Sequence, residues 1–287
     1  MGIINVTPDS FSDGGLFLDA NAAVEHGLEL VEQGAHILDI GGESTRPGAE
    51  PVGAAQELRR VVPVIEGLAG AVKSVPTRPQ ISIDTSKAAV AQAALRAGAS
   101  LVNDVSALRA DPEMAGLVAD SGAECCLMHM LGEPRTMQHD PRYGDVVDEV
   151  KAFLEERMTF AVREGIGEGR LLIDPGIGFG KTVEHNLELL RRLDELAALG
   201  RPIVIGTSRK SFLGRIAADA HGRSGPVDAQ GRLAGTLATN VMALERGASV
   251  FRVHDVAPVA EALSVAAATL SGRWTARSAA GETSTTG

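Results

Sequence analysis

The feature that most constrains this chain is a rhythm of short apolar runs and longer amphipathic stretches, repeated from end to end. Short apolar runs are typical of buried strands, and the Ala- and Glu-rich stretches between them have the apolar spacing of helices. The predicted strands are 2–6, 36–40, 80–84, 101–105, 123–129, 171–174, 203–206 and 249–253. The predicted helices are 20–33, 53–73, 87–97, 112–120, 145–164, 183–199, 230–246 and 256–270.

Eight strand-and-helix pairs in 287 residues fit one closed parallel barrel. We therefore predict an α/β fold, a single-domain (β/α)8 TIM barrel over residues 1–273, with a doubly wound open sheet as the alternative. Residues 274–287 consist mainly of Ser, Thr, Ala and Gly. They bury too little apolar surface to offset the entropy of ordering, so we expect a flexible C-terminal tail.

Charge and composition exclude several classes of function. The net charge of −10 argues against a general affinity for nucleic acid or anionic membranes. The sequence has neither a bilayer-spanning apolar run nor a signal-peptide pattern, so we expect a cytoplasmic protein. Cys125 and Cys126 are neighbours in one predicted strand, whose alternation sends them to opposite faces. We expect them to pack in the core without forming a disulfide or a zinc site.

Polar residues end nearly every predicted strand, and in a barrel those ends converge on one mouth. They are Asn5, Asp39, Asp84, Asn103, Asp104, His129, Asp174, Arg252 and His254, together with the segment 207–211 after the seventh strand. One such residue alone would usually be a helix cap, but converging carboxylates and amides carry a desolvation cost that a ligand would offset. Acids and amides suit a flat heterocycle with N–H donors. Arg46, Lys210, Arg252 and His254 suit a phosphate or carboxylate, so we expect a two-part ligand.

Three loops also carry information. Residues 7–15 and 41–48 are rich in glycine and hydroxyl groups, and their length favours loops that cover a substrate over plain turns. The segment 174–182 ends like a phosphate-binding P-loop, but Pro175 stands where that motif requires its first glycine. We therefore do not predict a nucleotide site.

Seven blocks together resemble the dihydropteroate synthase family, from residue 2 to about residue 257. They are GIINVTPDSFSDGG (2–15), DIGGESTRPG (39–48), SIDT (82–85), ND (103–104), DPGIGFGK (174–181), SRKS (208–211) and RVHD (252–255). The resemblance implies a barrel enzyme that joins 6-hydroxymethyl-7,8-dihydropterin pyrophosphate to 4-aminobenzoate and releases pyrophosphate. It also implies a Mg²⁺ cofactor and a homodimer that forms through outer helices.

The resemblance further implies roles for individual residues. The pterin would be bound by Asp84, Asn103, Met128, Asp174, Lys210 and Arg252. The pyrophosphate would lie against Asn5, Arg46, Arg252 and His254, with Asn5 as the protein ligand of Mg²⁺. The aminobenzoate would lie against Phe11, Thr45, Pro47, Phe179 and Ser211, the last near the start of a helix. Catalytic roles would fall to Asp13, Arg46, Lys210, Arg252 and His254.

Asp39 and Asp13 resemble acids that order loops or stabilise charge, and we interpret Arg252 as an anion contact at the mouth that adds little to the core. Many family members have residues ahead of the first strand, which here begins at residue 2, so we expect slightly weaker closure at the bottom of the barrel. Two alternatives stay open. A non-catalytic pterin-binding paralogue would keep only the pocket, and a pterin-dependent corrinoid methyltransferase would need neither the STRP loop nor the pair of Arg252 and His254.

Overall fold

Parallel strands paired in sequence order form the centre of the structure, a computed structural model that describes residues 1–7, 20–44, 50–133 and 136–274. In this part of the chain the strands are β1 (Gly2–Asn5), β2 (Ile37–Gly41), β3 (Gln80–Asp84), β4 (Leu101–Asp104), β5 (Glu124–Met128), β6 (Leu171–Asp174), β7 (Ile203–Ile205) and β8 (Ala248–Phe251). A parallel bridge between Gly2 and Val253 closes the barrel, and the Ile3 N–H donates to the Val253 carbonyl at 3.0 Å. The single-domain barrel is confirmed, and the weaker closure expected at this edge stays a prediction.

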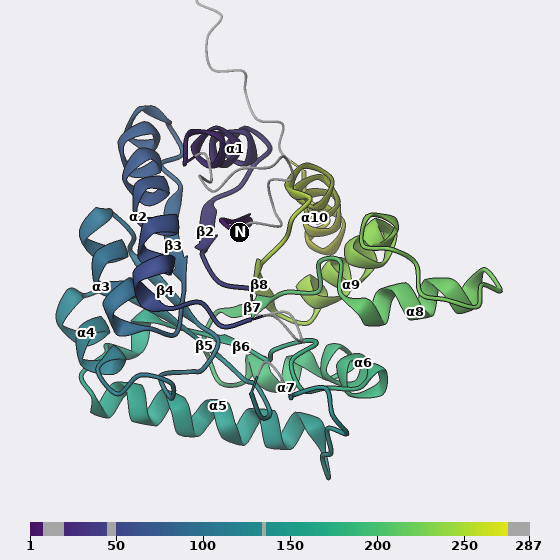
Figure 1. Cartoon of the computed structure of the whole chain (residues 1–287). Helices are drawn as coiled ribbons and strands as arrows, with labels where there is room; N and C mark the ends of the chain where they lie inside the picture. Colours follow the sequence, from purple (N-terminus) through teal and green to yellow (C-terminus); the bar gives the residue numbers. More distant parts are fainter. Residues whose placement is uncertain (8–19, 45–49, 134–135, 275–287) are drawn as a thin grey trace, which may run out of the picture.

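Helices surround the barrel (Figure 1). They are α1 (Ala20–Glu32), α2 (Ala54–Ala71), α3 (Ala88–Ala97), α4 (Met114–Ser121), α5 (Val146–Arg163), α6 (Val183–Arg191), α7 (Leu193–Ala197), α8 (Ser211–Ala220), α9 (Leu233–Glu245) and α10 (Val256–Ser271). No helix within the described ranges is long and apolar enough to cross a bilayer. The boundary predicted at residue 274 falls at the end of those ranges, so the tail stays a prediction.

Two helix predictions are wrong. The single helix predicted over 183–199 is divided into α6 and α7, because Arg192 between them leaves helical geometry at φ −111° and ψ 29°. The helices predicted from apolar spacing also omit α8, a helix of 10 residues that buries Phe212 and Leu213, although the family resemblance implies a helix start near Ser211. Its apolar pattern is short and contains Gly214, a poor helix former, so tertiary packing decides its conformation.

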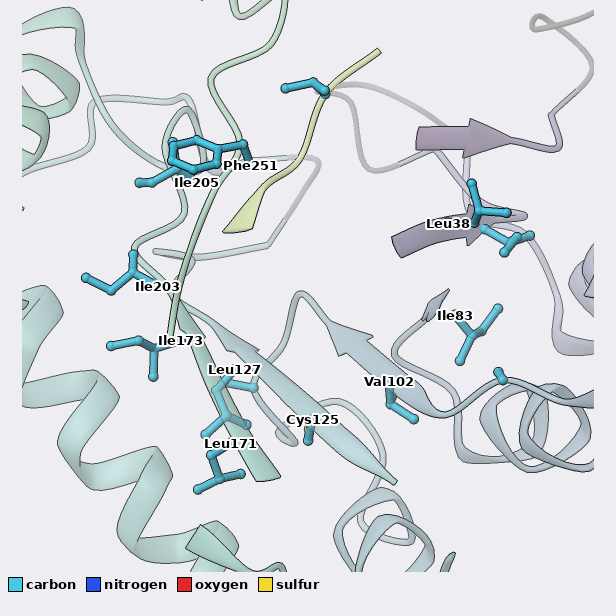
Figure 2. Packing of buried hydrophobic residues seen from close by; sticks show 14 of the residues in the cluster. Leu38, Ile83, Val102, Cys125, Leu127, Leu171, Ile173, Ile203, Ile205 and Phe251 are labelled. Carbon is cyan, nitrogen blue, oxygen red and sulfur yellow. The ribbon is translucent and has the colours of Figure 1, made fainter. Parts of the chain in front are cut away.

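Alternate side chains of each strand point to opposite sides of the barrel wall. Figure 2 shows part of the outer set, including Leu38, Ile83, Val102, Leu127, Ile173 and Ile205, which belongs to the large buried cluster shared with the helices. The inner set includes a separate cluster of Leu101, Cys126, Leu172 and Val204. Cys125 belongs to the outer cluster, and both thiols are free and buried, so the prediction that the cysteines pack in the core is confirmed.

Helices α1 and α2 approach each other closely at two glycines. A Cβ atom on Gly67 of α2 would lie 2.6 Å from Cγ2 of Val24, and one on Gly27 of α1 would lie 2.7 Å from Cδ2 of Leu68. Both distances are far shorter than a normal carbon contact, and β-branched Val24 has little rotamer freedom with which to yield. The two glycines therefore set the spacing of these helices.

This contact predicts opposite effects for two glycines in α2. Gly67→Ala should lower the free energy of unfolding by about 1–3 kcal/mol, because overpacking outweighs the gain in helix propensity. Gly70→Ala is the matched control, because no atom lies within 4 Å of its added Cβ, and it should raise stability by up to about 1 kcal/mol. Urea denaturation of both variants measures the difference, and equal stabilisation by both would contradict the close contact.

Candidate active site

A cavity of about 700 Å³ opens at the carboxyl ends of the strands. It is lined by every described residue that the family resemblance assigns to a ligand: Asn5, Asp84, Asn103, Met128, Asp174, Phe179, Lys210, Ser211, Arg252 and His254. Phe11, Asp13, Thr45, Arg46 and Pro47 lie outside the described residues. The predicted convergence on one mouth is therefore confirmed for these ten residues, while their individual roles stay predictions.

A buried network of charges lies beneath this cavity. Arg252 Nε donates to Asp39 Oδ2 at 2.6 Å, and Arg252 Nη2 donates to Asp84 Oδ2 at 2.7 Å. The Ser82 hydroxyl donates to Asp39 Oδ1 at 2.6 Å, and the Asn103 amide donates to Asp39 Oδ2 at 3.2 Å. These contacts hold the guanidinium in one orientation. Arg252 lines the cavity as expected, but it also neutralises the carboxylates of Asp39 and Asp84, so the expectation that it adds little to the core is wrong.

The acids Asp84 and Asp174 line the cavity itself. Burial raises the pKa of Asp84 to about 7, although the Arg252 guanidinium acts in the opposite direction. Burial also raises the pKa of Asp174, against the effect of the Gly176 N–H, which donates to Asp174 Oδ1 at 2.7 Å. Since these contacts use one oxygen of each acid, the other oxygen can accept a hydrogen bond from a ligand N–H.

The loops after β6, β7 and β8 bring positive and donor groups to the mouth. Lys210 Nζ lies 4.1 Å from the centre of the Phe179 ring, a cation–π contact between two loops. The Ser208 hydroxyl lies 3.0 Å from His254 Nδ1, so this contact involves Nδ1 and not Nε2. Ser211 is the first residue of α8, whose N-terminal N–H groups favour an anion. The arrangement suits a ligand with negative charge near the mouth.

Three strand-end residues expected at the mouth do not line the cavity. Asp39 is completely buried in the network beneath it. Asp104 accepts hydrogen bonds from the N–H groups of Ser106 and Leu108, both at 2.8 Å, and so stabilises a turn. His129 packs edge-on against Phe153, with ring centres 4.8 Å apart. For these three residues the expectation of a ligand contact is wrong.

Lys181 is among the cavity residues that were not predicted from the sequence. It is only 3% exposed, and its Nζ lies 2.9 Å from His129 Nδ1 and 3.0 Å from the Phe179 carbonyl oxygen. Burial lowers the pKa of Lys181 to about 7. Burial and the neighbouring Lys181 charge also lower the pKa of His129. Lys181 ends the block DPGIGFGK, so its place in that block was the available signal.

A divalent metal would find few protein ligands in this cavity. Within the described ranges no group of three or more His, Cys, Asp or Glu side chains could hold a metal ion. Asn5, at the end of β1, offers an amide oxygen on the same cavity wall as Arg252 and His254. Mg²⁺ commonly keeps several waters and binds through substrate phosphates with one or two protein oxygens. The donor set fits an ion held together with a phosphate.

Comparisons with known proteins agree with this geometry. The family described as pterin binding enzyme matches residues 1–254. The dihydropteroate synthase of Mycobacterium leprae is 49% identical over 271 residues, which cover 94% of this chain and 93% of that relative. The solved structure of Xanthomonas albilineans dihydropteroate synthase with 4-aminobenzoic acid has a TM-score of 0.84 and 48% identity, covering 94% of this chain and 92% of its own. The same enzyme with 7,8-dihydropteroate has a TM-score of 0.81 and 46% identity, with coverages of 94% and 92%.

The charge network predicts that Arg252 supports the fold as well as the site. Arg252→Gln should lower the free energy of unfolding by about 3–5 kcal/mol, because it leaves the buried carboxylates of Asp39 and Asp84 without their cationic partner. Adding Asp39→Asn removes one of those charges and should restore part of the stability without restoring activity. Urea denaturation and turnover of both variants test this, and wild-type stability of the single variant would contradict the network.

The lowered pKa of Lys181 predicts that the free energy of unfolding depends on pH. Its pKa is about 7 in the folded chain against 10.5 for the free side chain, so the unfolded chain holds this proton more tightly. The resulting cost to the folded state is fully present below about pH 7 and disappears as the pH rises toward about 10. Lys181→Met removes this cost. The free energy of unfolding of the variant minus that of the wild type should therefore fall between about pH 6 and about pH 9, and a constant difference would contradict the burial effect.

Proposed function

The chain belongs to the pterin binding enzyme family, and from that premise we infer that it is a dihydropteroate synthase of folate biosynthesis. It transfers a pterinylmethyl group from 6-hydroxymethyl-7,8-dihydropterin pyrophosphate to the amino group of 4-aminobenzoate. The observation that carries this conclusion is the convergence of the described ligand residues on one cavity, in a chain 49% identical to a dihydropteroate synthase. We disfavour the two alternatives, a paralogue that only binds pterin and a corrinoid methyltransferase. The relatives that align with nearly the whole of this chain are named dihydropteroate synthase.

We propose that the pterin ring lies on the cavity floor. Asp84 and Asp174 each have a carboxylate oxygen for the N–H groups of the ring, and the Asn103 side chain, 5% exposed, offers an amide oxygen. Met128 and the Arg252 side chain line the same space and would cover the two faces of the ring. Lys210, which faces Asp174 across the cavity closely enough to lower its pKa, would donate to a ring acceptor.

The pyrophosphate would lie above the ring, against Asn5, Arg252 and His254. Arg252 is fixed by its two carboxylate partners, so its orientation does not have to be set when the anion binds. Arg46, outside the described residues, is proposed as a second guanidinium for the same group. These groups would stabilise the negative charge that builds up on the leaving pyrophosphate.

The 4-aminobenzoate would occupy the outer part of the cavity. Its carboxylate would face Ser211 and the N-terminal N–H groups of α8, and its ring would pack against Phe179. Phe11, Thr45 and Pro47 are proposed to complete this pocket, and they lie outside the described residues. The amino group would then point inward, toward the methylene carbon of the pterin.

The proposed reaction breaks the bond between the methylene carbon and the pyrophosphate oxygen first, and the electron pair leaves with pyrophosphate. The resulting cation is spread into the pterin ring and stabilised by nearby carboxylate charge from Asp84, Asp174 and, on the resemblance, Asp13. The amine lone pair then forms the carbon–nitrogen bond, and the nitrogen loses a proton. Lys210 and His254 would hold the two reactants in place until this happens. The loops predicted to cover the substrate, residues 7–15 and 41–48, lie largely outside the described residues, and we propose that they exclude water.

We also propose a Mg²⁺ cofactor, with Asn5 as its protein ligand. The ion would supply charge neutralisation to the pyrophosphate, and the small number of donors among the described residues fits an ion that keeps most of its waters. A homodimer through the outer helices is proposed as well, supported by exposed Leu187 on α6 and Met242 on its neighbour α9. A cytoplasmic location stays a prediction.

The proposed function predicts release of pyrophosphate that depends on both substrates. With the pterin pyrophosphate and 4-aminobenzoate present together, pyrophosphate and dihydropteroate should appear in equal amounts, because one bond is formed for each bond broken. A metal chelator should abolish turnover, and added Mg²⁺ should restore it. Coupled detection of pyrophosphate, with chromatography of the pteridine product, measures both quantities.

Asn5→Ala is the variant that tests the metal ligand. It should raise the Mg²⁺ concentration needed for half-maximal turnover, since the ion loses its protein oxygen, while pterin affinity changes little. Equal pyrophosphate release with and without 4-aminobenzoate would refute the proposed coupling. Full activity in chelator would refute the metal requirement but leave the synthase activity standing.

A further inference from the structure

The loop between β6 and α6 carries a buried cation that the proposed mechanism does not use. Lys181 contacts two neutral acceptors, His129 Nδ1 at 2.9 Å and the Phe179 carbonyl at 3.0 Å. Among the ion pairs of the described residues, none involves Lys181. Burying an ammonium without a carboxylate partner is costly, so this lysine is poorly explained as a stabilising contact.

The loop that Lys181 ends has a conformation that depends on close backbone contacts. Gly176 has φ +68°, and a Cβ on it would lie 1.8 Å from the His129 carbonyl oxygen, so the loop runs directly over the end of β5. The Gly178 N–H donates to Asn186 Oδ1 at 2.6 Å, and the Tyr143 hydroxyl donates to the Gly180 carbonyl at 2.8 Å. The glycine backbone is thus anchored on both sides of Phe179.

Lys181 supplies the anchor for the residue between these glycines. The carbonyl of Phe179 is one acceptor of its ammonium, and the ring of Phe179 lies on the cavity wall, 4.1 Å from Lys210 Nζ. With the ammonium donating, the His129 ring accepts at Nδ1, and the ring itself packs edge-on against Phe153. A continuous chain of contacts therefore runs from Phe153 on α5 through His129 and Lys181 to the Phe179 backbone.

We propose that Lys181 is a positioning residue for the amine substrate: its ammonium ties the Phe179 backbone to the His129 ring and so sets the place of the Phe179 ring on the cavity wall. This inference rests on the proposed function, because it takes the Phe179 ring as a wall of the 4-aminobenzoate pocket. The Lys181 charge also lowers the pKa of Asp174, but it acts there after the Gly176 N–H, Lys210 and Arg252, which all remain when Lys181 is replaced. The pterin side of the cavity therefore depends less on Lys181.

The test is the response of the two substrates to Lys181→Met, which keeps the length of the side chain and removes its charge and donors. The KM for 4-aminobenzoate should rise about tenfold, because a misplaced wall weakens binding and orientation. The KM for the pterin pyrophosphate, and the affinity for 6-hydroxymethylpterin measured by calorimetry, should change by less than about threefold. Lys73→Met is the control, because Lys73 is exposed after α2 and lines no part of the cavity.

His129 provides a second test that does not alter Lys181. His129→Leu removes the acceptor and should reproduce the rise in KM for 4-aminobenzoate, whereas His129→Asn keeps an oxygen near the place of Nδ1 and should restore most of the affinity. In the Lys181→Met background, His129→Leu should add little further effect, because the two residues act through one contact.

The outcomes separate this inference from the proposed function. Wild-type protein that forms no dihydropteroate would refute the function itself. An active wild type with unchanged KM values in Lys181→Met, or with both KM values raised by the same factor, would overturn the positioning role. A selective rise for 4-aminobenzoate, shared by His129→Leu and reversed in His129→Asn, would establish it.

Discussion

The site depends on one guanidinium with two carboxylate partners. Arg252, just beyond β8, pairs with Asp39 of β2 and with Asp84 of β3, so a single side chain joins the last strand to the second and third across the barrel. Asp39 is completely buried and also accepts from Ser82 and Asn103. Because these contacts already fix Arg252, the cavity can present a positive charge in a defined direction before any anion arrives, and reorganisation during the reaction is small.

Along a strand, the inward-facing side chains change from apolar core residues to polar site residues within two positions. Inward-facing side chains alternate, so Leu101 is followed on the same face by Asn103, and Leu172 by Asp174. The apolar layer formed by Leu101, Cys126, Leu172 and Val204 supports the polar layer directly above it. Apolar packing below and ion pairs within the polar layer thus act on the same strands, which explains how acids with raised pKa values are kept in place.

Much of the fold could be predicted because each buried parallel strand is a short apolar run, and the predicted strand ends differ from the observed ones by no more than two residues. The convergence of the site residues followed from the barrel alone. Alternation places Asn103 and Asp104 on opposite sides of the wall, but which of these two polar residues faces the cavity could not be predicted. Lys181 could not be predicted either, since its contacts depend on the path of a glycine loop and on a histidine 52 residues away.

The two adjacent cysteines have a practical consequence. Their sulfur atoms lie on opposite sides of the barrel wall, both are completely buried, and burial raises the pKa of each thiol. An alkylating reagent can reach Cys125 only after a helix separates from the sheet, and Cys126 only after the barrel interior is exposed. Since the sequence contains no other cysteine, the pair forms an intrinsic label that distinguishes detachment of the outer layer from opening of the barrel itself.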